Sequence, residues 1–160
     1  MTGAPLRSLL WIDDDAPERF KHEDRLLSRA GWDITWANSA KAGAEALRDK
    51  PFEVVLLDQM LPWSEDSLGK EPEEVWAGCL LLFWLRNQGR PSKAPPREAF
   101  EGLYTMKPLK TNRKVPVILG SAYYDDEIMA SLLEIEPELP EIPKPIDCNR
   151  LLELLASAVS

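Results

Sequence analysis

The chain has 160 residues, of which 44% are hydrophobic, and a formal net charge of −8. This length and this hydrophobic share predict one globular domain over residues 1–160, and they exclude a disordered chain. The acidic balance argues against direct binding of nucleic acid. The longest apolar stretch, Val75 to Leu85, has 11 residues and is too short to span a bilayer.

The N-terminus and the cysteines favour a cytoplasmic protein. Residues 1–5 lack the charged and apolar regions of a signal peptide. Cys79 and Cys148 have neither metal-ligand spacing nor a redox motif, which predicts free thiols in a reducing compartment. We therefore expect a cytoplasmic location and no membrane attachment.

Strands and helices are predicted to alternate along the whole chain. The first elements are a strand at Leu9–Ile12, a helix from Pro17 to about Ala30, a strand at Asp33–Ala37, a helix capped by Asn38 or Ser39 and running through about Lys50, and a strand at Phe52–Leu57. The later elements are a helix at Trp76–Gln88, a strand at Val115–Leu119, a helix at Asp125–Glu136, a short strand near Leu139–Ile142 and a last helix capped by Asp147.

This alternation predicts an α/β fold with a doubly wound parallel sheet of five strands. In the first helix, Phe20, Leu27 and Ala30 recur at near-helical spacing and are expected to face the sheet. Pro140 and Pro143 predict that the fifth strand is short and lies at an edge.

Polar residues follow the carboxyl ends of these strands. The first strand is followed by three carboxylates, 13–15, and the third by Asp58. Ser121 follows the fourth strand, and Lys144 follows the fifth. Because the carboxyl ends of parallel strands meet at one crevice, these groups are expected to converge. Together they can hold a divalent cation and a phosphoryl group.

Four short motifs carry a resemblance to the receiver domains of two-component response regulators. They are Ile12-Asp13-Asp14-Asp15, Leu57-Asp58-Gln59-Met60-Leu61-Pro62, Leu119-Gly120-Ser121-Ala122 and Lys144-Pro145. They occur in the family's order, each at the expected strand, and the resemblance covers nearly the whole chain. It implies a flavodoxin-like (β/α)5 receiver fold. It also implies a stand-alone, atypical receiver and phosphoprotein of a phosphorelay, with no enzyme activity beyond its own phosphorylation and dephosphorylation.

The resemblance assigns Asp58 as the phosphoacceptor. A carboxylate can attack phosphorus when the charge around it is neutralised. Asp13 and Asp14 match the family's acidic pair and are expected to bind Mg²⁺ together with Asp58 and the backbone carbonyl of Met60. Mg²⁺ prefers hard oxygen ligands and keeps several waters, which suits this set.

Lys144 and Ser121 are expected to contact the phosphoryl oxygens, Lys144 as a point charge and Ser121 through its hydroxyl. Asp15 is expected instead to cap the helix that starts at Pro17. His22 is the chain's one histidine and is predicted to face solvent. The phosphoryl donor is therefore expected to be a histidine kinase or a histidine phosphotransfer protein.

The chain departs from the family pattern in three places. If Gly78 is the glycine that opens the third helix, residues 63–76 are an insertion between the third strand and that helix. A second insertion, 91–112, joins the third helix to the fourth strand. The family's aromatic switch residue has no evident counterpart, because Glu141 or Ile142 occupies its place on the fifth strand. A relay through a rotating ring is therefore not expected.

Charge is distributed unevenly along the chain. Residues 90–114 carry seven bases against two acids, and residues 125–141 carry seven acids and no base. Residues 65–74 are also acidic. Such blocks are usually solvated surface, but they also predict an acidic output face. Its partner would be a basic surface of a downstream protein, or the 90–114 segment of a second copy.

Two other functions remain open. The first is a pseudo-receiver, a protein-binding module of the same fold that works without phosphorylation, which the insertions and the missing switch residue favour. The second is a small Mg²⁺ phosphatase of the haloacid-dehalogenase type, with Asp13 and Asp15 as its D-x-D motif. That function would leave Asp58 without a role, and the chain has no obvious cap domain.

Overall fold

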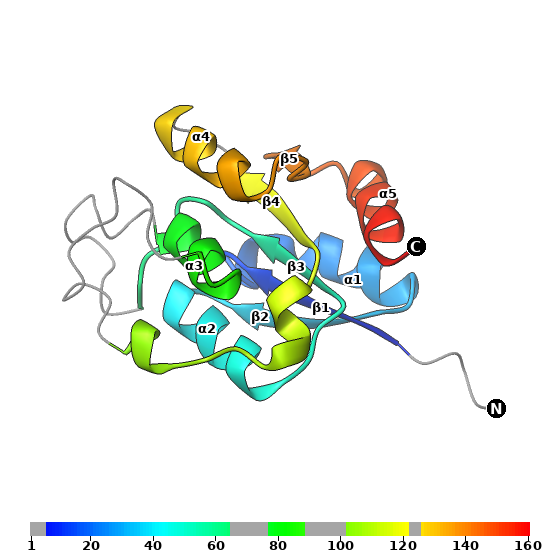
Figure 1. The fold of residues 1–160 in the computed structure, drawn as a ribbon. Helices are drawn as coiled ribbons and strands as arrows, with labels where there is room; N and C mark the ends of the chain where they lie inside the picture. The colour runs from blue at the N-terminus through cyan, green and yellow to red at the C-terminus, as the bar shows by residue number, and fades with distance from the viewer. Residues whose placement is uncertain (1–5, 65–76, 89–101, 122–125) are drawn as a thin grey trace.

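The computed structural model describes residues 6–64, 77–88, 102–121 and 126–160 (Figure 1). These residues form a five-stranded sheet with the order β2-β1-β3-β4-β5, and all neighbouring strands are parallel. The strands are β1 (Arg7–Ile12), β2 (Trp32–Ala37), β3 (Val54–Leu57), β4 (Val117–Ser121) and β5 (Glu141–Pro143). The predicted fold class is confirmed, and so is the short fifth strand at the edge.

Helices cover both faces of the sheet. They are α1 (Lys21–Arg29), α2 (Ala40–Asp49), α3 (Ala77–Leu85), α4 (Asp126–Ile135) and α5 (Cys148–Val159), with short 3-10 turns η1 (Glu18–Phe20), η5 (Leu103–Thr105) and η6 (Lys110–Lys114). Buried residues of α1 and α5 form one core cluster with the sheet. Those of α2, α3 and α4 form a second cluster on the opposite face. The site described below lies where both layers meet the carboxyl ends of the strands.

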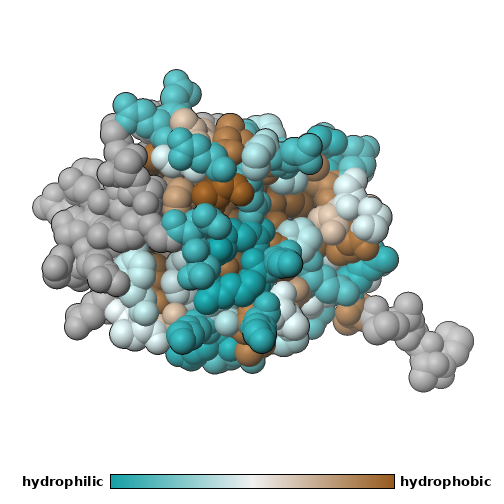
Figure 2. Space-filling view, in the orientation of Figure 1, coloured by the Kyte–Doolittle hydropathy of each residue, from teal (hydrophilic) through white to brown (hydrophobic). Residues whose placement is uncertain are grey.

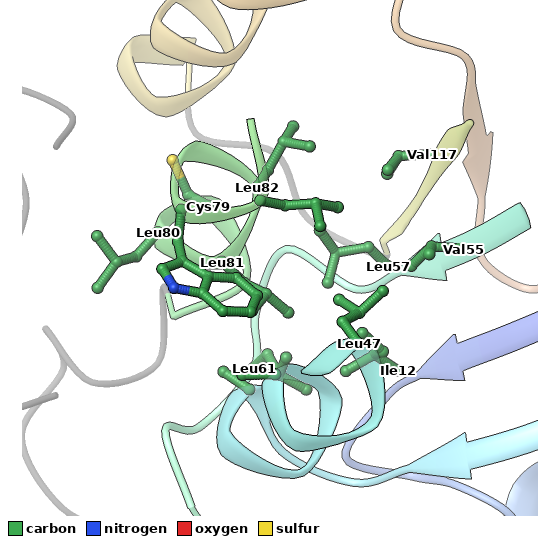
Figure 3. Close-up of a cluster of buried hydrophobic side chains, with 14 of the residues drawn as sticks. Ile12, Leu47, Val55, Leu57, Leu61, Cys79, Leu80, Leu81, Leu82 and Val117 are labelled. Carbon is green, nitrogen blue, oxygen red and sulfur yellow. The ribbon is translucent and has the colours of Figure 1, made fainter. Parts of the chain in front are cut away.

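Helix α3 is the centre of the second cluster. All of its residues are buried, as expected of a helix that is hydrophobic around its whole circumference. Leu57 of β3, Leu47 of α2 and Val117 of β4 belong to the same cluster, and Figure 3 shows them on one side of α3, with Leu80 projecting away from them. Part of the cover comes from the predicted second insertion, because the Trp84 indole N–H donates to the carbonyl of Met106 at 3.1 Å.

The described part of that insertion, residues 102–112, is anchored by Asn112, which is fully buried. Its Nδ2 donates to the carbonyls of Leu47 (2.8 Å) and Lys50 (2.7 Å) at the end of α2. Its Oδ1 accepts from the N–H of Phe52 at 3.0 Å. Because this N–H is occupied, β3 begins at Val54 and not at Phe52 as predicted. One side chain thus binds two carbonyls at the C-terminal end of α2, where the helix has no partners of its own to offer.

Two arginines join the end of α3 to the segment before β4. Arg86 donates to the carbonyls of Arg113 (2.9 Å) and Val115 (2.6 Å) and forms an ion pair with Glu136. In return, Arg113 donates to the carbonyl of Trp84 at 3.1 Å, so that a cation stabilises the C-terminus of α3. Val115 therefore serves as a hydrogen-bond acceptor just outside β4, which begins at Val117 and not at Val115.

Several local predictions are tested by these elements. Ser39 caps α2 by accepting from the N–H of Ala42 at 3.1 Å, and Asp147 caps α5. Phe20 and Leu27 are buried as predicted. The prediction for Ala30 is wrong, since α1 ends before it and leaves it exposed next to Gly31, whose φ is +95°.

The predicted cap by Asp15 is also wrong. The first helical turn begins after Pro17, and neither it nor α1 has a side-chain cap. The Asp15 carboxylate instead lies 3.6 Å from the guanidinium of Arg19, one turn along the chain.

The face of the molecule drawn in Figure 2 is mainly polar where the structure describes it. Hydrophilic residues predominate across the middle of the face in Figure 2, with hydrophobic residues in smaller areas between them. In the described ranges, the large hydrophobic side chains that are exposed are Leu6 and Leu133, and His22 is exposed as predicted. No helix in these ranges is long and apolar enough to cross a membrane.

Candidate functional site

Asp13 and Asp58 stand side by side because their strands are paired. Ile12 and Leu57 are partners in the ladder between β1 and β3, and each aspartate is the next residue. The N–H of Asp58 donates to the carbonyl of Ile12 at 2.9 Å, and the N–H of Asp13 donates to the carbonyl of Ala37 at 2.9 Å. Both carboxylates are buried, with 1% and 4% of each residue exposed.

Lys144, the residue after β5, reaches both carboxylates. Its Nζ lies 2.6 Å from Oδ2 of Asp13 and 3.2 Å from Oδ2 of Asp58. The other oxygens accept backbone hydrogen bonds, Oδ1 of Asp58 from Met60 (3.2 Å) and Oδ1 of Asp13 from Asp15 (2.9 Å). Such contacts are needed, because a buried charge without a partner strongly destabilises a fold.

Asp14 completes a group of oxygens that suits a hard divalent cation. One carboxylate oxygen each from Asp13, Asp14 and Asp58 lies within 4.8 Å of the other two, and Asp14 is the exposed member. Mg²⁺ typically binds one or two carboxylates, phosphate oxygens and waters. The donor set fits this ion, with an open side at Asp14 for waters.

Electrostatics at the site favour a cation. Burial, and then the charge of Asp13, raises the pKa of Asp58 from 3.8 to about 7, although Lys144 opposes the shift. Desolvation by the surrounding protein and the charges of Asp13 and Asp15 raise the pKa of Asp14. Burial lowers the pKa of Lys144, but its carboxylate partners outweigh this and the net shift is upward. The raised pKa values of Asp58 and Asp14 mean that one ammonium does not offset burial and the mutual repulsion of the carboxylates, so a further cation would favour their ionised forms.

Solved structures similar to this chain are receiver domains. A response regulator receiver domain protein from Methanospirillum hungatei JF-1 is 21% identical, with a TM-score of 0.60 over 96% of this chain and 94% of that chain. The signal receiver domain of an HD domain-containing protein from Pseudomonas fluorescens Pf-5 is 18% identical, with a TM-score of 0.65 over 96% and 94%. A response regulator from Burkholderia pseudomallei, which holds a phosphorylated aspartic acid, a calcium ion and citrate, is 16% identical, with a TM-score of 0.56 over 93% and 66%.

This chain has the fold of a receiver domain. No protein-family model and no curated protein sequence matches it, so the likeness lies in the fold. Within this receiver fold, the predicted residues Asp13, Asp14, Asp58 and Lys144 come together. Ser121 ends β4 at the same edge of the sheet, opposite Pro143 of β5, but its side chain lies outside the described part of the structure.

The sequence predicts no aromatic switch residue on the fifth strand, and the structure agrees. Strand β5 consists of Glu141, Ile142 and Pro143, so it carries no aromatic side chain. Ile142 is buried and Glu141 is exposed. Trp63, which follows Pro62 just beyond Asp58, is buried in the core cluster of α2 and α3.

The sequence analysis assigned no role at the site to two residues that lie near it. The Phe20 ring lies 5.8 Å from Nζ of Lys144 and 4.6 Å from the Trp11 ring, and Trp11 stacks on Trp36 at 4.7 Å. The sequence indicated only that Phe20 is a core residue. Gln59 is the second, because it is fully buried beside Asp58, and no local pattern predicts that a polar residue in this loop is buried.

Proposed function

We propose that the chain is a phosphoacceptor receiver whose Asp58 takes a phosphoryl group from a phosphohistidine of a histidine kinase or histidine phosphotransfer protein. The observation that supports this most is the convergence of Asp13, Asp14, Asp58 and Lys144 at the carboxyl edge of the sheet. Mg²⁺ would be held by the three carboxylates and the carbonyl of Met60. When bound, it supplies positive charge and a coordination position for a phosphoryl oxygen.

In the transfer, an ionised oxygen of Asp58 attacks phosphorus. A P–O bond forms, the P–N bond to the histidine breaks, and the imidazole leaves with the electron pair of that bond. Asp58 must be ionised for this attack, and its raised pKa makes the positive charge around it decisive. Lys144, already 3.2 Å from Oδ2 of Asp58, is positioned to donate to the incoming phosphoryl oxygens. Ser121 is expected to donate a further hydrogen bond to the group.

The phosphorylated domain would act through contacts with other proteins, in the cytoplasm and not as an enzyme. Exposed acidic residues lie on α4, in the segment after it and on β5. The missing aromatic side chain on β5 argues against a relay through a rotating ring. We therefore expect the output surface on α4 and β5, directed toward a basic partner.

A pseudo-receiver that works without phosphorylation is the second candidate. The absence of an aromatic side chain from β5, where Glu141 is exposed and Ile142 is buried, favours it. The carboxylate cluster around Lys144 opposes it, since an unused site need not retain buried charges that burial makes costly.

Intact-mass spectrometry after incubation with acetyl phosphate tests the proposal. Wild type should gain one phosphoryl group when Mg²⁺ is present and none when it is absent. Asp58→Asn should remain unlabelled, while Asp15→Asn, a control outside the cation group, should label like wild type. An unlabelled wild type would favour the pseudo-receiver, and a phosphoryl group mapped to Asp13 would favour the phosphatase.

A further inference from the structure

Gln59 is a buried amide with unmet hydrogen-bonding capacity. The residue is 0% exposed. In the described ranges of the chain, neither its Nε2 nor its Oε1 has a hydrogen-bond partner. A carboxamide offers two donor hydrogens and one acceptor oxygen. Asn112, the other fully buried amide side chain named above, makes three hydrogen bonds. The side-chain amide of Asn112 is thus hydrogen-bonded, whereas that of Gln59 is not.

Packing alone does not explain a glutamine at this position. A buried polar group without a partner costs free energy, and such groups are rare in folded proteins. Methionine has a similar length and no amide, so it would fill the space without this cost. A role in another state of the protein would account for the amide.

The position of Gln59 indicates which state that is. It is the residue after Asp58, so the two α-carbons are about 3.8 Å apart. The β3–β4 ladder pairs Leu57 with Leu119, and continuing this register by two residues brings Gln59 opposite Ser121. Gln59 is therefore next to the proposed phosphoacceptor, in the loop after β3 and at the same edge of the sheet as the end of β4. A phosphoryl group on Asp58 would bring three strong acceptor oxygens to this place.

We propose that Gln59 is a further phosphoryl-binding residue, whose Nε2 donates a hydrogen bond to the group carried by Asp58. This inference rests on the proposed function. The amide has no partner in the resting protein and gains one on phosphorylation, so it favours the phosphorylated state at the expense of the resting state. An interaction made in only one of two states shifts the equilibrium toward that state. Gln59 thereby stabilises the phosphorylated state relative to the resting state in a receiver without an aromatic switch residue.

The test compares Gln59→Met with wild type in two measurements. The first is the thermal midpoint of the resting protein, which should rise by about 2–4 °C because the unsatisfied amide is gone. The second is the Kd for beryllofluoride, a phosphoryl analogue, at fixed Mg²⁺, which should increase roughly tenfold because a hydrogen bond to a charged group is lost. Gln88→Met, at an exposed position, is the matched control and should change neither value.

An unchanged Kd in Gln59→Met would overturn the role of Gln59. If the thermal midpoint of Gln59→Met also falls, the explanation would be that a bound water already satisfies the amide in the resting protein. Wild type and Asp58→Asn are titrated in parallel. If wild type does not bind beryllofluoride, or if Asp58→Asn binds it equally well, the proposed function itself fails. A wild type that binds while Gln59→Met binds equally well leaves that function intact and removes only the role of Gln59.

Discussion

A β-carbon on Gly78 would lie 2.1 Å from the backbone carbonyl oxygen of Asp58. The first turn of α3 is thus in direct contact with the backbone of the proposed phosphoacceptor. Backbone atoms cannot rotate away as the end of a side chain can, so only glycine fits here without a shift of the chain.

Gly78→Ala should therefore destabilise the domain by about 1–3 kcal/mol and slow the labelling of Asp58 by acetyl phosphate. Denaturant unfolding and intact mass measure the two effects. Gly43→Ala is the control, because its β-carbon would meet the end of the Ile12 side chain at 2.6 Å. A Gly78→Ala protein with the stability and labelling of wild type would contradict the close contact.

The stability of the metal-free domain should fall as pH rises from about 4 to about 7. The pKa of Asp58 is raised to about 7 in the folded protein, so the folded state retains a proton that the unfolded state has released. This contribution is complete below the unfolded pKa, near 4, and is lost as pH rises through 7. Thermal unfolding with a chelator should show this fall in wild type and a smaller one in Asp58→Asn. Equal pH profiles for both proteins would argue against the raised pKa.

Mg²⁺ should bind the unphosphorylated domain weakly, because three carboxylates and one carbonyl leave positions for water. Tryptophan fluorescence is the expected readout, since the Trp11 ring packs against Phe20, whose ring lies near Lys144. Asp14→Ala should lose the response. Asp15→Ala, whose carboxylate lies near Arg19, should keep it. Equal titrations for wild type and Asp14→Ala would show that the cation binds elsewhere.

Asn112→Ala should destabilise the domain by about 2–4 kcal/mol, because three hydrogen bonds to the backbone are lost. The N–H of Phe52 and the carbonyl of Lys50 lose their side-chain partner, while the carbonyl of Leu47 still accepts from the N–H of Leu109. Urea unfolding provides the measurement, and the exposed neighbour Thr111→Ala is the control. The phosphoryl site is distant, so beryllofluoride affinity should not change. A loss below about 0.5 kcal/mol would mean that water replaces the side chain.

Association of copies through opposite charges is a further expectation. The exposed acids of α4 and β5 would contact the basic segment of a second copy, and salt would weaken this contact. Neutralising Lys107, Lys110 and Lys114 together should abolish any beryllofluoride-dependent association in sedimentation. Arg113 is left intact because it supports α3. Association that resists both salt and neutralisation would leave a different partner as the explanation.

The sequence predicted the elements whose signals are local. Strand-end acids after apolar runs located Asp13 and Asp58. Residue type predicted the cap at Asp147 and narrowed the cap of α2 to Asn38 or Ser39, of which the structure shows Ser39. The structure added what depends on contacts between distant segments. Asn112 shortens β3 from 60 residues away. The unpartnered state of Gln59 depends on the whole fold around it, so no pattern in its neighbourhood could have predicted it.

The anchoring of α2 by Asn112 also constrains the order in which the chain can fold during its synthesis. Helix α2 and the start of β3 leave the ribosome early, but their polar partner is encoded 60 to 65 residues later. At about 5–20 residues per second, this is a wait of roughly 3–13 s. During that time, water must bind the carbonyls at the end of α2 to which Asn112 later donates. Its final docking is therefore a late event, timed by translation of the segment before β4.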